Sequence, residues 1–379
     1  MDKKLQSRHY QFLDLFRLFA MLLVMWGHII GTGAYATEIF NVIQGPLDKP
    51  MVNAAGLLLL KPEQWLYNIF HTQAAVLGVV MFFMCTGYLV AGMLERYKPS
   101  EFLVNRVLRI IPTLAVCTAI NGLILFFSQG LTFSPAEYLS TIFMYYQWTL
   151  GIPIMTLLWT LSVEIVFYLC AALLRKFRVW NVALFYNVIL ASVIASGWIS
   201  QQGMHRLYNF CYDLRYCSFA LLGVCLYLSE GTQGRSRWMS AGLILVSLGL
   251  NLIIFRGNRY LYGDTTTYPE ISTHLIPLGL FLVLRWLDKK EALGFMQRWK
   301  WPSHLASLVY PVYLTHVVVG LNTVYWLSQT EINRYLVLAA GFVASFLCAQ
   351  LVSWIVEKPS ARWSKAAVAA MRRRTAKTI

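Results

Sequence analysis

An arginine and a histidine lie eleven residues apart in an apolar segment, FLDLFRLFAMLLVMWGHIIG, that is long enough to cross a bilayer. On a helix this spacing makes three turns plus about 20°, so Arg17 and His28 would point to one side, about 16 Å apart along the axis. Imidazole can take a proton from a hydroxyl group near neutral pH, and guanidinium can bind an anion. An ionisable side chain within the bilayer costs about 2.5 to 3.5 kcal/mol, so we interpret the pair as functional. The alternative is that Arg17 snorkels to the membrane surface beside Asp14 while His28 only packs between helices.

Two further arginines, Arg106 and Arg109, are spaced about one helical turn apart in NRVLRIIP, just before Pro112. Guanidinium groups on one helix face can bind phosphate bidentately, so both are candidates for holding a nucleotide-bearing cofactor on the cytoplasmic side. Taken alone, the pair also fits the basic residues that ordinarily flank the cytoplasmic end of a membrane helix.

A carboxylate, Glu164, lies within the apolar run LWTLSVEIVFYL. At that depth it needs a cation, a hydrogen-bonding partner or a proton of its own. Arg17 and His28 are its expected partners.

Polar side chains also mark two apolar segments near the C-terminus. Tyr310, Tyr313 and His316 are three residues apart in LVYPVYLTHVVV and fit either a site or an interfacial aromatic belt. We assign Tyr313 and His316 to cofactor binding. Glu357, two residues before Pro359, is interpreted as a helix terminus paired with a nearby basic residue.

The elements that position these side chains are membrane-spanning helices. Of the 379 residues 58% are hydrophobic and 13% are charged, and the mean hydropathy is +0.55. We predict an all-α, polytopic integral membrane protein whose ten spans cover residues 11–34, 73–95, 106–128, 157–175, 180–200, 213–229, 237–254, 272–287, 304–325 and 335–357.

The basic residues indicate the orientation of these spans. Most of the 32 Lys and Arg residues fall on the side that holds both termini, which predicts that both termini are cytoplasmic. The formal charge of +15 is therefore attributed to topology and anionic lipid, with no nucleic-acid partner. We divide the chain into a transmembrane domain, 1–358, and a basic cytoplasmic tail, 359–379. Two long outer loops, 35–72 and 129–156, could hold a substrate. No metal-binding spacing of Cys and His is present, so no metal is expected.

Six segments in this order resemble the membrane acyltransferase-3 family, the ten-helix O-acyltransferases that modify bacterial surface glycans: FLDLFRLFAMLLVMWGH, FFMCTGYL, NRVLRIIP, LWTLSVEIVFYL, VYPVYLTH and VEKP. Two departures keep a small residue or a hydroxyl group. Thr86-Gly87-Tyr88 replaces the usual Ser-Gly-Phe, and Thr160 stands where serine is frequent. The resemblance is to a stand-alone form without a periplasmic hydrolase-like domain.

The resemblance implies roles for individual residues. His28 would be the catalytic histidine, Arg17 its partner in binding or positioning the acyl donor, and Glu164 the acidic residue of the site. Arg106 and Arg109 match the paired arginines on the acyl-CoA side.

These roles imply a transferase of the bacterial cytoplasmic (inner) membrane. It would move an acyl group, expected to be acetyl, from cytosolic acyl-CoA to a hydroxyl of a surface or lipid-linked carbohydrate. The acceptor stays open among lipopolysaccharide O-antigen, exopolysaccharide, peptidoglycan, an osmoregulatory glucan and a lipid-linked sugar, and membrane lipid is the other partner. The competing class is a proton-coupled transporter or flippase for a polar lipid or glycan, in which Arg17, His28 and Glu164 would relay protons.

Overall fold

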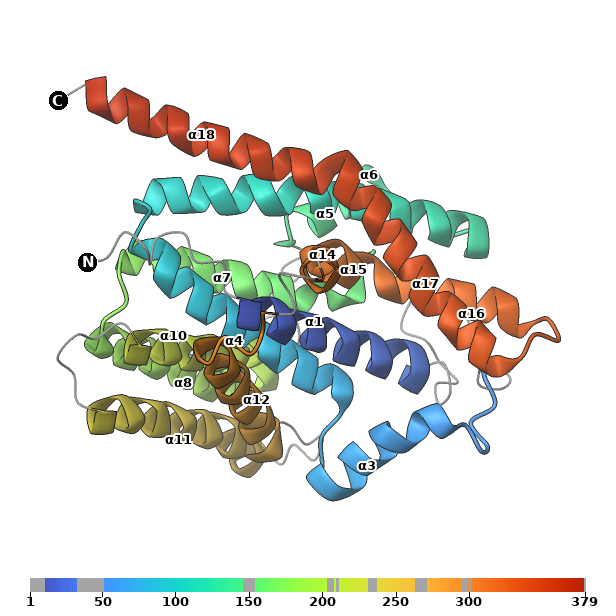
Figure 1. The fold of residues 1–379 in the computed structure, drawn as a ribbon, viewed down its shortest axis with the longest axis horizontal. Coiled ribbons are helices and arrows are strands. Elements are labelled where there is room, and N and C mark those ends of the chain that lie inside the picture. The colour runs from blue at the N-terminus through green and yellow to red at the C-terminus, as the bar shows by residue number, and fades with distance from the viewer. Residues whose placement is uncertain are drawn as a thin grey trace.

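The fold of the chain is a bundle of helices (Figure 1). The computed structural model describes residues 11–32, 51–145, 154–202, 208, 211–230, 237–262, 271–294, 299 and 301–377, and these contain no β-strand. The longer helices are α1 (Gln11–Met25), α3 (Lys61–Phe70), α4 (Ala74–Leu94), α5 (Pro99–Gln129), α7 (Trp159–Leu174), α8 (Val179–Gln201), α10 (Cys217–Glu230), α11 (Arg237–Tyr262), α12 (Ile271–Lys289), α17 (Arg334–Val352) and α18 (Lys358–Lys377). The shorter ones are α6 (Pro135–Ile142), α14 (Trp301–Ser307), α15 (Val309–Thr315), α16 (Leu321–Ser328) and the 3₁₀ turns η3 (Leu58–Leu60), η5 (Thr156–Leu158) and η6 (Leu214–Tyr216).

All ten predicted spans fall on helices. Within the described residues, seven helices are long and apolar enough to cross a membrane. Helices α14 to α16 count as an eighth span if α14 and the segment Val309–Ser328, which meet at a 50° bend, are treated as one crossing. The other two predicted spans fall on shorter apolar helices, Trp159–Leu174 and Ala241–Phe255. The prediction of an all-α polytopic membrane protein is confirmed. Of the two predicted outer loops, residues 33–50 and 146–153 lie outside the described residues, as does the N-terminal segment 1–10.

Helix α4 lies at the centre of the bundle and packs against α1 on one side and α10 on the other (Figure 1). Glycines allow these close approaches. A Cβ atom at Gly78 would lie 2.4 Å from the Ala20 carbonyl oxygen of α1, and one at Gly87 would lie 1.7 Å from the Ala220 carbonyl oxygen of α10. Close backbone contact at small residues is how membrane helices gain packing energy where lipid and protein are equally apolar.

Within the described part of the chain, three π-helical turns interrupt the bundle helices. They are η2 (Trp26–Thr32), which continues α1, η7 (His316–Gly320), which continues α15, and η8 (Ser353–Glu357), between α17 and α18. Such turns are rare and occur often at functional sites. Each contains a polar residue singled out from the sequence: His28, His316 and Glu357, respectively.

The C-terminal tail is helical and lies along α5 (Figure 1). Arg372 of α18 donates two hydrogen bonds to the buried Glu101 carboxylate of α5, at 3.2 and 2.9 Å. A second contact joins the same two helices, in which the Asn105 amide of α5 donates to the Ser364 hydroxyl of α18 at 2.6 Å. The tail is therefore tied to α5 at two points.

Candidate functional site

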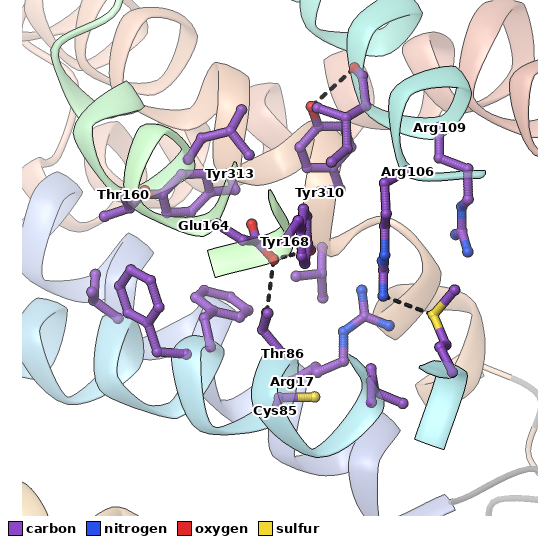
Figure 2. A pocket seen from close by; sticks show the side chains of 18 of the residues that line it. Arg17, Cys85, Thr86, Arg106, Arg109, Thr160, Glu164, Tyr168, Tyr310 and Tyr313 are labelled. Atoms are coloured by element: carbon purple, nitrogen blue, oxygen red, sulfur yellow. Dashed lines mark hydrogen bonds between the residues drawn. The ribbon is translucent and has the colours of Figure 1, made fainter. Parts of the chain in front are cut away.

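A cavity of about 390 Å³ lies between α1, α4, α5, α7, α15 and η8. Its polar lining combines cationic, carboxylate and hydroxyl side chains, namely Arg17, Arg106, Arg109, Glu164, Glu357, Thr86, Thr160, Tyr168, Tyr310 and Tyr313. Figure 2 shows the three arginines on one side, Thr160 and Tyr313 on the opposite side, and Glu164 between them. The structure thus brings five of the seven predicted site residues into one cavity.

The three arginines have hydrogen-bonding capacity to spare. No carboxylate of the described residues lies within ion-pair distance of Arg17, Arg106 or Arg109. Arg106 lies over the Tyr168 ring, 4.8 Å from its guanidinium carbon to the ring centroid, and donates from Nη2 to the Met93 sulfur at 2.9 Å. Its Nε is buried without a partner among the described residues. Guanidinium groups gathered in this way form a binding site for an anion.

Glu164 is held by hydroxyl groups. Thr86 of α4 donates to its Oε1 at 2.8 Å, and Tyr168, one turn along α7, donates to the same oxygen. The expectation that Arg17 or His28 pairs with this carboxylate is therefore wrong, because neighbouring hydroxyls satisfy it instead. Oε2 takes no hydrogen bond from the described residues, so the carboxylate presents an acceptor to the cavity.

Tyr313 lines the end of the cavity opposite the arginines (Figure 2). Its hydroxyl lies 2.6 Å from the Thr160 hydroxyl, and its ring packs edge-on against Phe82, with 5.8 Å between the centroids. The Tyr310 hydroxyl donates to the Ile110 carbonyl oxygen at 3.1 Å and ties α15 to α5.

His28 and His316 lie beyond this end of the cavity and contact each other. His28 Nδ1 is 3.0 Å from His316 Nε2, and the ring centroids are 5.2 Å apart. His28 is partly exposed, whereas His316 is fully buried. The His316 ring is 5.9 Å from the Tyr313 ring. A continuous series of side chains thus leads from the cavity through Tyr313 and His316 to His28.

The sequence predicts that Arg17 and His28 share one side of a helix. In the structure Arg17 lines the cavity, whereas His28 does not. The predicted separation of about 16 Å along the helix axis accounts for this difference, since His28 lies past the Tyr313 end of the cavity in contact with His316.

Sequence reasoning missed several polar residues of the cavity. Tyr168 lies four residues after Glu164, so helical periodicity places it on the same face, and that signal was available. Thr86 belongs to a segment noted only for its departure from the family pattern. Glu357 was interpreted as a helix terminus but lines the cavity, and nothing in its local sequence indicates that placement.

Comparison with known proteins gives one match. A protein-family model of the acyltransferase-3 family, described as an acyltransferase domain, matches residues 10–356. Searches of curated proteins and of solved structures return no match. The family match spans both histidines of the pair and every residue of the cavity except Glu357, which directly follows its last matched position, and the chain therefore belongs to the acyltransferase-3 family.

Proposed function

We propose that this acyltransferase takes an acyl group from acyl-CoA, with acetyl-CoA as the donor to test first, and transfers it to a hydroxyl of a surface or lipid-linked carbohydrate. One observation carries the donor assignment. Three guanidinium groups without ion-pair partners among the described residues occupy one side of a cavity whose opposite side leads to a pair of histidines. A donor with phosphates at one end and a thioester at the other fits this polarity.

The cavity also suggests how the donor is oriented. Phosphate oxygens would bind Arg106 and Arg109 at the start of α5, with Arg17 completing the anion site. Amide groups along the middle of the donor would meet Glu164, whose free oxygen can accept from an N–H. The thioester would then lie at Thr160 and Tyr313. Because Tyr313 lies between this end of the cavity and the histidine pair, it would turn aside for the thioester to reach His28.

The chemistry at His28 is general-base catalysis. Its neutral imidazole removes the proton of the acceptor hydroxyl as the oxygen attacks the thioester carbonyl carbon. The C–O bond forms and the C–S bond breaks. The thiolate that leaves takes the proton back from the imidazolium, so His28 returns to its starting state and free CoA is released.

The partial exposure of His28 leaves room for an acceptor hydroxyl to reach it, and its place beyond the Tyr313 end of the cavity favours approach from the side opposite the arginines. We place the protein in a bacterial inner membrane with both termini in the cytoplasm, so that acyl-CoA arrives from the cytosol and the carbohydrate from the far side.

The direct test is transfer of radiolabelled acetyl from acetyl-CoA to membrane carbohydrate in vesicles that contain the protein. The wild type should label carbohydrate, and His28→Gln should lower the rate at least 100-fold with unchanged protein levels. His304→Gln is the matched control, since His304 is exposed on α14 and pairs with Gln350. Full labelling by His28→Gln would refute the role of His28. Absence of labelling by the wild type with acetyl-CoA and with longer acyl-CoA donors would refute the donor assignment.

A further inference from the structure

The contacts of His316 indicate a role other than the cofactor binding expected from the sequence. It is fully buried in the first position of η7 and is separated from the cavity by Tyr313. Its two ring nitrogens face different groups, the backbone on one side and His28 on the other. The described contacts of this enclosed side chain are with His28, the Tyr313 ring and the backbone.

The backbone fixes where His316 carries its proton. Nδ1 lies 3.1 Å from the Val312 carbonyl oxygen and 3.0 Å from the Tyr313 carbonyl oxygen. Carbonyl oxygens only accept hydrogen bonds, so Nδ1 must carry the hydrogen. A neutral imidazole has one N–H, which leaves Nε2 of His316 as an acceptor.

The acceptor on His316 then fixes the tautomer of His28. Nδ1 of His28, 3.0 Å away, must donate to it. With its own hydrogen on Nδ1, neutral His28 has a lone pair on Nε2. That nitrogen is the one left to take a proton from a substrate.

We propose that His316 is a positioning residue of the acyl-transfer reaction. It holds His28 in the tautomer whose Nε2 is the base, and it accepts the Nδ1–H bond that strengthens when His28 becomes an imidazolium. The inference rests on the proposed function, since it assigns a partner to the proposed base. The backbone carbonyls of Val312 and Tyr313 complete the series by fixing His316 in turn.

Two substitutions separate this role from packing. Glutamine reaches as far from the backbone as Nε2 of the imidazole, so in His316→Gln its amide oxygen can accept from His28. Asparagine reaches only as far as Nδ1, so in His316→Asn the amide can still donate to the Val312 and Tyr313 carbonyls but cannot reach His28. The first substitution keeps the bond to His28, and the second keeps the bonds to the backbone.

In vesicles supplied with acetyl-CoA, His316→Asn should lower kcat about 10- to 100-fold and leave KM for acetyl-CoA within about twofold. His316→Gln should recover most of that loss. Equal losses in both variants, or a rise in KM with kcat unchanged, would overturn the proposal in favour of packing or donor contact. Wild-type activity in His316→Asn would overturn it as well.

A second readout does not depend on turnover. In solid-state NMR of purified protein labelled with [¹⁵N]histidine, the His28 signals, identified by their loss in His28→Gln, should be those of an Nδ1–H tautomer. In His316→Asn the Nε2–H form should appear. An Nε2–H tautomer in the wild type would overturn the proposal. If the wild type is inactive but His28 has the Nδ1–H tautomer, the proposed donor is refuted and the assigned arrangement of the histidine pair is retained. The two failures are therefore distinguishable.

Discussion

Arg106 provides the sharpest test of how the cavity holds its donor. Its guanidinium group stacks on Tyr168, and Nε is buried without a partner among the described residues, so a bound phosphate would gain a preformed, charge-assisted contact. Such hydrogen bonds contribute about 1.5 to 3 kcal/mol. At about 1.4 kcal/mol for each factor of ten, Arg106→Gln should raise KM for acetyl-CoA about 10- to 150-fold.

The change should fall on KM and leave kcat nearly unchanged, because a phosphate far from the thioester is bound equally in the ground and transition states. Arg106→Lys should give an intermediate KM, since it keeps the charge but loses the planar fork. Lys365→Gln, an exposed cation on α18, is the matched control and should behave as the wild type.

The assay is free-thiol release in vesicles, run with acetyl-CoA and with acetyl-pantetheine, which lacks every phosphate. Wild type and Arg106→Gln should use acetyl-pantetheine at similar rates, because the lost contact has no phosphate to bind in either case. An equal rise in KM for both donors would refute the phosphate contact and indicate that Arg106 shapes the cavity. An unchanged KM for acetyl-CoA would refute it outright.

Two stability predictions follow from helix packing. Gly87→Ala should lower the free energy of unfolding by about 3 kcal/mol, because the added Cβ would overlap the Ala220 carbonyl oxygen and push α4 away from α10. Gly249→Ala, where a Cβ meets nothing within 4 Å, should be neutral or stabilising by up to about 1 kcal/mol, and thermal unfolding in detergent compares the two. If both lower the melting temperature equally, close packing at Gly87 is not the cause. Glu101→Gln should weaken the bond to Arg372 by about 1 kcal/mol, because the Arg372 side chain is about half exposed to solvent although Glu101 is buried, and should speed limited proteolysis of α18. An unchanged cleavage rate would show that packing alone holds the tail.

The membrane helices could be predicted from the sequence because transfer into a bilayer depends on local composition and length. Even α7, too short to qualify by length alone, was found from its apolar run. Arg106, Arg109 and Glu164 were found by a related rule, since ionisable groups in or beside such runs need an explanation. Each of these signals lies within one helix.

The features that could not be predicted are contacts between different helices. The bond between His28 and His316 joins positions 288 residues apart, and both residues lie in π-helical turns that regular periodicity does not describe. The prediction of which groups pair with Glu164 was wrong in part for the same reason, because one of its two partners, Thr86, comes from another helix. The role of each residue in Thr86-Gly87-Tyr88 also depends on contacts with other helices. Thr86 binds the carboxylate, Gly87 lets α10 approach, and the Tyr88 hydroxyl donates to Glu230 at 2.8 Å.

The contact between Thr160 and Tyr313 has a consequence for the membrane itself. A cell that stores energy as an ion gradient loses it through any continuous water-filled path, and a transferase with substrates on two sides risks creating one. Here the Thr160 and Tyr313 hydroxyls, with Phe82 packed on the Tyr313 ring, lie between the arginine-lined cavity and the histidine pair. On the proposed route, the side chains that must part for the acyl group would also be the ones that limit ion leakage while the enzyme is at rest.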